Sequence, residues 1–207
     1  MYPNPIFRQA DVLQNLGFAR DRAFGILSIN GDQGPQMAHI PFLLNAVGDQ
    51  ADLHLVRSNP IARALAAPQQ AVIAISGPDG YISPDWYGVP DQVPTWNYVA
   101  VHLRGRLELL PQDDMRDMLD RQSAHFETQL LPKNPWKTTK MTPDVRDRMM
   151  RQIVPCRLTI TSVSGTWKLG QNKPDAVRER AAGQVRSAHI GTETALLAAL
   201  MLAPPKA

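Results

Sequence analysis

The sequence predicts a mainly β protein in which the strands form a barrel and the helices lie around it. Two observations support this fold class. Short apolar segments alternate with turns rich in Gly, Asn and Pro through about the first 80 residues, a pattern that favours a barrel over a parallel layered sheet. Helical periodicity appears mainly later, at about 111–152 and 174–207. We therefore expect a single domain spanning 1–207, with a helical insertion in the first of these ranges and a helical tail in the second.

The N-terminal elements follow from caps and turns. Asp11 can cap a short helix, because apolar residues recur behind it at helical spacing. A turn-rich stretch at 30–35 joins two strands as a hairpin, and the run Gly77-Pro78-Asp79-Gly80 is expected to close the strand before it. The first strands are expected at 24–29, 36–44, 53–56 and 71–76.

The later elements differ in kind. A long strand at 97–107 has two chemically different faces, because Val99, Val101 and Leu103 alternate with other residue types. Pro111 opens a helix with two aspartates in its first turn, where the helix dipole favours them. The remaining elements are a linker candidate at 131–143, helices from Thr142 and Pro174, a strand at 156–167 and an apolar helix at 195–202.

Composition is that of an ordinary globular protein. The 207 residues are 43% hydrophobic and 20% charged, and a chain of this length can bury a sizeable core. No apolar run is long enough to cross a bilayer, and the first residues lack the pattern of a secretion signal. Cys156 is the only cysteine, which excludes an intrachain disulfide and a cysteine-based zinc site. We expect a cytoplasmic protein with no membrane segment.

Charge is distributed unevenly along the chain. The segment 133–186 holds twelve Lys or Arg and four Asp or Glu, a balance of +8, whereas the remainder has a balance of −5. Such a segment suggests an anionic partner, either a cofactor phosphate or a nucleic-acid backbone. A solvated basic face explains the same count equally well.

The run Arg57-Ser58-Asn59-Pro60 is the most informative local pattern. A strand ends here, Asn59 is a good N-cap, and Pro60 suits the first helical position. Unpaired N–H groups at that helix start, beside Arg57 and Ser58, could seat a phosphate. A plain helix cap is the alternative, and it is the commoner outcome for this pattern alone.

Two further groups could contact a ligand. The segment 168–173 has two lysines and two amides around a glycine, and these supply donors for a phosphate or for the polar edge of a flavin; a solvated loop is the alternative. An aromatic cluster could cover a planar ligand or bury a dimer seam, and the sequence leaves both open. Its members are Tyr81, Trp86, Tyr87, Trp96 and Tyr98.

Metal and hydrolytic sites are not predicted. His39, His54 and His102 fall on different strands and could converge, but no pair has the spacing typical of a metal site. A structural or cofactor-edge histidine is therefore favoured over a metal or haem ligand. The chain has no glycine-rich dinucleotide motif, no Walker-type loop and no nucleophile elbow. The aspartates between 113 and 120 fit an exposed helix face, so no catalytic residue is assigned.

Together, several runs resemble the FMN-binding negative transcriptional regulators of the PaiB type. They follow the family's order over roughly the first 175 residues. The runs are Met1-Tyr2-Pro3 with Phe7, Phe24-Gly25-Ile26-Leu27-Ser28, His39-Ile40-Pro41-Phe42-Leu43, Leu53-His54 with Arg57 and Asn59-Pro60, Gly77-Pro78 with Tyr81-Ile82-Ser83-Pro84 and Trp86-Tyr87, Val93-Pro94-Thr95-Trp96-Asn97-Tyr98 with Val101-His102 and Gly105, and Lys168-Leu169-Gly170-Gln171-Asn172-Lys173-Pro174.

The resemblance implies a six-stranded antiparallel Greek-key split barrel of the FMN-binding type, similar to pyridoxamine phosphate oxidases and flavin reductases. It also implies a homodimer with FMN in a cleft to which both chains contribute. By this analogy one strand lines the flavin, the loop after the next strand faces the phosphate, and the final strand closes the site. The implied cofactor-binding residues are His39, Ile40, Pro41, Phe42, Arg57, Ser58, Asn59, Trp96, Tyr98, Lys168 and Gln171. Relatives commonly carry serine at the position of Gly170, so one hydroxyl donor is absent here.

For function, the resemblance implies a negative transcriptional regulator rather than a dedicated enzyme. No helix-turn-helix is evident, so the basic segment 133–186 is the sequence's support for DNA contact. A flavin-dependent oxidoreductase acting on a small molecule is one alternative. A haem-binding or haem-degrading split barrel that uses His39, His54 or His102 is another.

Overall fold

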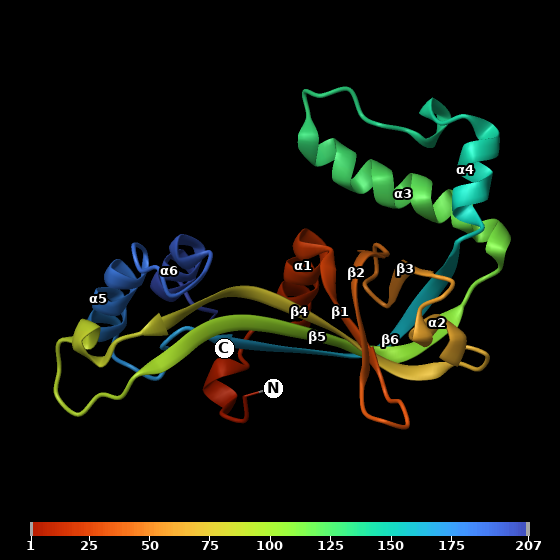
Figure 1. Ribbon diagram of the computed structural model, residues 1–207. Helices are drawn as coiled ribbons and strands as arrows, with labels where there is room; N and C mark the ends of the chain where they lie inside the picture. The colour runs from red at the N-terminus through yellow and green to blue at the C-terminus, as the bar shows by residue number, and fades with distance from the viewer. Residues whose placement is uncertain (1, 206–207) are drawn as a thin grey trace. The chain divides into compact units, whose positions relative to one another are not determined.

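Six strands close into a barrel in the computed structural model, which describes residues 2–205. The strand order is β1-β2-β3-β6-β5-β4-β7, and β1 pairs with β4 as well as with β2. The barrel predicted from the sequence is therefore confirmed, with β7 as a two-residue addition to β4 (Figure 1). The strands are β1 (Phe24–Ile29), β2 (Gln36–Leu44), β3 (Gln50–Val56), β4 (Gln69–Ile82), β5 (Thr95–Leu109), β6 (Ile153–Lys168) and β7 (Gly191–Thr192).

The helices lie where capping and periodicity predict them. Asp11 accepts a hydrogen bond from Gln14 N at 2.7 Å and so caps the first helix. Short 3₁₀ turns precede or link several of the others. The helices are α1 (Val12–Arg22), α2 (Pro60–Ala64), α3 (Met115–Glu127), α4 (Pro143–Met150), α5 (Asp175–Val185) and α6 (Thr194–Leu202). Met1, which begins one of the matching runs, lies outside the described residues.

The chain divides into two compact units. The first unit comprises the residues up to Arg22, Ile75–His102 and the residues from Val163 onward, and it contains α1, α5 and α6. The second unit comprises Ala23–Ala74 and Leu103–Ser162, and it contains α2, α3 and α4. The long strands β4, β5 and β6 contribute residues to both units. The helical insertion expected at about 111–152 thus belongs to the second unit, and the tail expected at about 174–207 belongs to the first.

In the second unit, alternation along the strands builds the barrel interior. β1 and β2 pair in antiparallel register, with Phe24 opposite Pro41 and Ile26 opposite His39. Every second residue of these strands points inward, because successive side chains of a strand lie on opposite faces. The fully buried interior includes Leu27, Phe42, Leu53, Ile73 and Leu103. The alternate residues of β1 and β2 remain on the outside.

A polar network attaches α3 to the barrel of the second unit. The side chain of Asp52 on β3, which is 7% exposed, accepts hydrogen bonds from Arg157 at 2.7 and 3.0 Å and from Arg121 of α3 at 3.0 Å. Burial alone would raise the pKa of Asp52, but these two guanidinium groups outweigh it and hold the pKa below its usual value. Beside them, Gln122 contacts His54 Nδ1 at 3.1 Å and donates to the Asp52 carbonyl at 3.1 Å. Burial lowers the pKa of His54.

In the first unit, the three helices surround a core that includes Tyr87, Trp167 and Met201. α5 and α6 lie side by side (Figure 1). The buried amide of Asn15 on α1 accepts a hydrogen bond from Trp167 Nε1 at 2.9 Å and donates to two carbonyls of its own segment. Gly165 leaves room for that amide, since a Cβ there would lie 1.9 Å from Asn15 Oδ1.

The turn predicted at Gly77-Pro78-Asp79-Gly80 is wrong, because β4 runs without interruption from Gln69 to Ile82. The two glycines serve packing instead of turning. A Cβ on Gly77 would lie 2.6 Å from Phe18, and one on Gly80 would lie 3.0 Å from Leu197. Glycine therefore marks close approach of helices to this strand.

Candidate functional site

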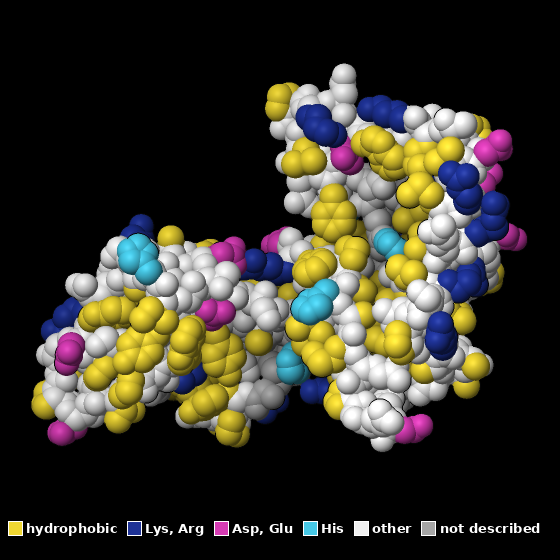
Figure 2. Space-filling model, in the orientation of Figure 1, with side chains coloured by type: hydrophobic (Ala, Val, Ile, Leu, Met, Phe, Trp, Pro, Cys, Tyr) yellow, Lys and Arg dark blue, Asp and Glu magenta, His cyan; other side chains and the backbone are white. Residues whose placement is uncertain are grey.

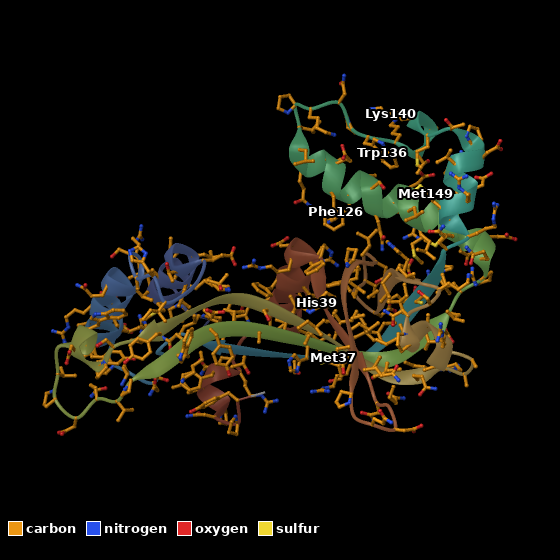
Figure 3. The ribbon with its side chains drawn as sticks, in the orientation of Figure 1. Met37, His39, Phe126, Trp136, Lys140 and Met149 are labelled. Carbon is orange, nitrogen blue, oxygen red and sulfur yellow. The ribbon has the colours of Figure 1, made fainter. Side chains whose placement is uncertain are left out.

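The strand predicted to line a flavin, β2, presents only half of its predicted residues outward. Ile40 and Phe42 are 3% and 0% exposed and belong to the barrel interior. His39 is exposed and Pro41 is partly exposed on the other face, next to Met37, which is 61% exposed. Figure 3 shows Met37 and His39 along β2. Ile40 and Phe42 could therefore contact a ligand only through their backbone.

The outer face of β1 and β2 is apolar and aromatic. The His39 ring stacks on Phe24 of β1, with ring centroids 6.4 Å apart and an interplanar angle of 24°. Phe24 is 53% exposed, so this pair and Met37 form an open apolar surface. Phe24 and Met37 were not among the predicted site residues. The register of the β1–β2 hairpin could have indicated them, because Met37, His39 and Pro41 share one face of the strand.

Arg57 and Ser58, predicted to face a phosphate, are both exposed. Arg57 Nε donates to the Arg151 carbonyl at 3.0 Å, and Nη2 donates to Gln112 Oε1 at 2.8 Å and to the Ile153 carbonyl at 3.4 Å. Its Nη1 makes no hydrogen bond within residues 2–205. The guanidinium is therefore held in position with one nitrogen still able to donate.

Asn59 uses its side chain within the chain. Its Oδ1 accepts a hydrogen bond from Ile61 N at 2.9 Å, as the predicted cap requires. The helix that follows, α2, has only five residues. A macrodipole needs a longer run of aligned peptides, so the phosphate argument rests on the side chains of Arg57 and Ser58 rather than on the helix start.

The predicted loop at 168–173 belongs to the first unit, and several of its polar groups form hydrogen bonds within that unit. Lys168 Nζ donates to Thr95 Oγ1 at 2.5 Å and lies 5.1 Å from the centroid of the Tyr2 ring. Partial burial lowers the pKa of Lys168. Gln171 bridges the turn, accepting from Leu169 N at 2.8 Å and donating to the Trp167 carbonyl at 2.5 Å. These bonds shape the loop, and the Lys168 ammonium and the Gln171 amide each keep N–H groups that the bonds do not use.

Gly170 adopts a φ of +85°, a left-handed conformation in which an L side chain is strained. The loop of this chain is thus built for glycine. A serine at this position would be strained in this backbone conformation. The absence of that hydroxyl is consequently tied to the local backbone, not only to the side chain.

The two predicted aromatic residues of β5 point to the same face of the first unit. Trp96 is 46% exposed and meets Tyr81 edge-on, with ring centroids 6.5 Å apart. Partial burial raises the pKa of Tyr98, and the neighbouring Tyr2 raises it further. Tyr2 therefore lies beside both Tyr98 and Lys168, a contact that sequence spacing could not show. Tyr87 of the same cluster is 1% exposed and belongs to the core.

The predicted site residues thus fall into two groups. His39, Ile40, Pro41, Phe42, Arg57, Ser58 and Asn59 lie in the second unit, and Trp96, Tyr98, Lys168 and Gln171 lie in the first. Residues that could hold FMN are best represented in the second unit. A flavin ring needs an apolar surface, which the outer face of β1 and β2 offers, and a phosphate needs donors, which Arg57 and Ser58 offer. These residues fit FMN, and their roles remain predictions.

The basic segment 133–186 does not form one surface element. It is divided between the units, and four of its cations are in ion pairs: Lys133 with Glu127, Arg146 with Asp147, Arg157 with Asp52, and Arg178 with Asp175. Among residues 2–205, no group of three or more His, Cys, Asp or Glu side chains could hold a metal ion. No helix in that same range is both long and apolar enough to span a membrane.

Comparison with known proteins gives one family and several relatives. Residues 1–162 match the family described as "Putative FMN-binding domain". The chain is 27% identical over 179 residues to "Protease synthase and sporulation protein PAI 2" of Bacillus subtilis, covering 84% of this chain and 83% of the relative.

Solved structures with the same fold include a flavocytochrome, Anf3, from Azotobacter vinelandii and a FAD and haem binding protein from Mycobacterium smegmatis. The match to Anf3 has a TM-score of 0.59 at 18% identity and covers 81% of this chain and 72% of the Anf3 chain. The match to the Mycobacterium smegmatis protein has a TM-score of 0.57 at 17% identity and covers 79% of this chain and 74% of that protein's chain. At these identities the likeness extends to the fold alone.

Proposed function

This chain belongs to the family of FMN-binding domains, and from that premise we propose that it binds FMN on the outer surface of its split barrel as a homodimer. The observation that carries the proposal is the pairing of an apolar strand face with a positioned cation in the second unit. β2 and β3 are antiparallel, with Phe42 opposite Leu53. Arg57 follows Leu53 by four residues and His39 precedes Phe42 by three, so both lie beyond the same end of this pairing.

In this proposal the flavin ring packs on the outer face of β1 and β2, against Phe24, His39 and Met37. Arg57 Nη1 and the Ser58 hydroxyl hold the phosphate. FMN, when bound, supplies hydride or electron transfer. The exposed apolar side chains of that face, 53% for Phe24 and 61% for Met37, are also the kind of surface that a second chain covers.

The test is FMN affinity, measured by quenching of flavin fluorescence on titration with purified protein. Arg57→Gln removes the proposed phosphate ligand and should weaken FMN binding about tenfold to a hundredfold, because a hydrogen bond to a charged group contributes about 1.5–3 kcal/mol. Binding of riboflavin, which lacks the phosphate, should hardly change.

Arg63→Gln is the matched control, because Arg63 is exposed on α2 within six residues of Arg57. Equal losses in both variants would mean that general charge, and not the Arg57 site, attracts FMN. Loss of riboflavin binding in Arg57→Gln would contradict the assigned phosphate role in the same way. Absorbance spectra with FMN, FAD and haem establish which cofactor the protein prefers.

We further propose that the flavin-bound dimer acts as a negative transcriptional regulator through basic residues of the insertion. Lys137, Lys140, Arg148 and Arg151 are exposed there and have no salt bridge within residues 2–205. Cations without an acidic partner are free to contact nucleic-acid phosphates. DNA binding should weaken steeply as salt rises, and a mobility-shift assay that detects no complex at low salt would contradict the regulator.

A flavin-dependent oxidoreductase is the second candidate function. It is supported by the exposure of the strand face on which the flavin ring is proposed to pack. The surface around His39 is exposed, so a small substrate could approach a flavin bound there. Steady consumption of NADH or NADPH in the presence of FMN would favour this function. A Soret band that is lost in His39→Ala would favour haem binding instead.

A further inference from the structure

The insertion of the second unit contains a partly open cavity that the flavin proposal does not use. Its volume is about 300 Å³, and it lies between α3, the loop after it, α4 and the start of β6. The walls are mainly apolar, and Figure 2 shows hydrophobic side chains gathered over the insertion. The lining includes Leu119, Trp136, Met141, Met149, Met150 and Ile153. The volume is at the lower end of the range for ligand pockets, about 300–1,000 Å³, so the site suits a small ligand.

A second hollow continues the first along α3. It measures about 380 Å³ and shares the side chains Ser123, Trp136 and Thr138 with the first cavity. The Trp136 side chain, labelled in Figure 3, is therefore a common wall of both hollows. A tryptophan ring offers a flat apolar face, and the three methionines can adapt to the shape of a guest.

Specific contacts hold the loop that closes the cavity. Glu127 at the end of α3 accepts a hydrogen bond from Trp136 N at 2.7 Å and forms an ion pair with Lys133. Thr138 is buried and donates to Asp120 Oδ1 at 2.5 Å. The stretch expected to be a linker at 131–143 is thus folded against α3 by polar anchors on both sides of Trp136.

One wall of the cavity carries a positioned cation. The side chain of Arg146 on α4 is 17% exposed and lines the cavity. Its Nε and Nη2 lie 2.9 and 2.8 Å from a single oxygen of Asp147, and its Nη1 makes no hydrogen bond within residues 2–205. Lys137 lines the second hollow, whereas the acidic residue there, Asp120, already accepts from Arg116 and Thr138. The Nη1 group of Arg146 is therefore a charged donor that the ion pair with Asp147 leaves unused.

We propose that this cavity binds a small monocarboxylate with an aromatic or branched apolar body. The apolar part would pack between Trp136 and the methionines, and the carboxylate would accept from Arg146. An unused guanidinium N–H beside apolar walls favours a ligand with one anionic end, because a hydrogen bond between two charged groups is stronger than one to a neutral acceptor. The site lies in the insertion, and its occupation does not depend on flavin.

The experiment uses 1-naphthoate as the probe and the purified 207-residue chain, with binding measured by ligand-observed saturation-transfer NMR. Arg146→Gln should weaken naphthoate binding about tenfold or more, since it removes the charge-assisted hydrogen bond. Arg148→Gln is the matched control, because Arg148 is an exposed residue of the same helix and does not line the cavity. The neutral 1-naphthalenemethanol should bind the native chain about tenfold more weakly than naphthoate.

Ser123→Phe is the second variant, because it fills space shared by both hollows while the polar anchors of the loop stay in place. It should abolish naphthoate binding and leave the circular-dichroism spectrum unchanged. Equal binding by the two arginine variants, or no binding by the native chain, would overturn the proposal. Sedimentation gives a further test. If the native chain is a dimer and Ser123→Phe dissociates it, a second copy of the chain occupies the cavity, and the proposal is overturned. Arg57→Gln should bind naphthoate normally, which separates this inference from the FMN proposal.

Discussion

The two units of this protein solve the same problem, attaching helices to long strands, in different ways. In the first unit the attachment is steric: Asn15 fills the space above Gly165 and bonds Trp167, and Gly77 allows close approach by Phe18. In the second unit the attachment of α3 is electrostatic, through the carboxylate of Asp52. The second unit also presents the open face of β1 and β2, the positioned Arg57 and the cavity of the insertion, on which both proposals rest.

The largest expected effect tests the steric attachment. Gly165→Ala places a Cβ 1.9 Å from Asn15 Oδ1, so the buried Asn15 amide must move and its hydrogen bond with Trp167 is lost. We expect the free energy of unfolding to fall by about 3 kcal/mol, at the upper end of the usual cost of overpacking. Chemical denaturation monitored by tryptophan fluorescence measures it.

Gly183→Ala is the control from the same unit. A Cβ at Gly183 meets no atom within 4 Å, and the residue is exposed within α5. Alanine is the better helix former, so this variant should be more stable by about 0.5–1 kcal/mol. A small effect in Gly165→Ala would show that the first unit adapts easily and would remove the contrast between the units.

Local rules predicted much of the barrel from the sequence. β1 and β2 begin and end at the predicted residues because a turn-rich stretch separates two segments of clear composition. The N-caps at Asp11 and Asn59 also form as predicted, since a cap depends only on residues within one helical turn. Features set by neighbouring residues are thus readable from the sequence.

Features set by distant residues were not readable. The glycines at 77 and 80 indicated a turn, yet they accommodate Phe18 and Leu197, which are far away in the sequence. The hydrogen bonds of Gln171 to Leu169 and Trp167 within its own loop were likewise not evident from its residue type. In the candidate site, Arg57 and Lys168 are both basic residues, and only the contacts show that Arg57 is held by Gln112 and two backbone carbonyls whereas Lys168 bonds Thr95. The cavity of the insertion required three elements to meet, so no single periodic pattern indicated it.

Weakening the electrostatic attachment of α3 in the second unit should lower the free energy of unfolding by less than the Gly165→Ala substitution does. Asp52→Asn removes the carboxylate charge with which both Arg121 and Arg157 form ion pairs. We expect a loss of about 2 kcal/mol in the free energy of unfolding. This is below the 3–5 kcal/mol typical of a broken buried pair, because the two arginine side chains are 42% and 31% exposed and partly screened by solvent.

The ion pairs of Asp52 with Arg121 and Arg157 make the stability of the second unit sensitive to acid. The folded pKa of Asp52 lies below the ordinary value of 3.8, so its contribution to stability is present above that pH and is lost as the pH falls through the folded pKa. Asp117→Asn is the control, since its side chain is 73% exposed and should contribute less than about 0.5 kcal/mol. Denaturation at pH 7 and below pH 3.8 should therefore show the Asp52→Asn deficit shrinking in acid, while the Gly165→Ala deficit stays constant. A deficit of equal size at both pH values would mean that Asp52 acts through shape and not through charge, and the two units would then be held in the same way.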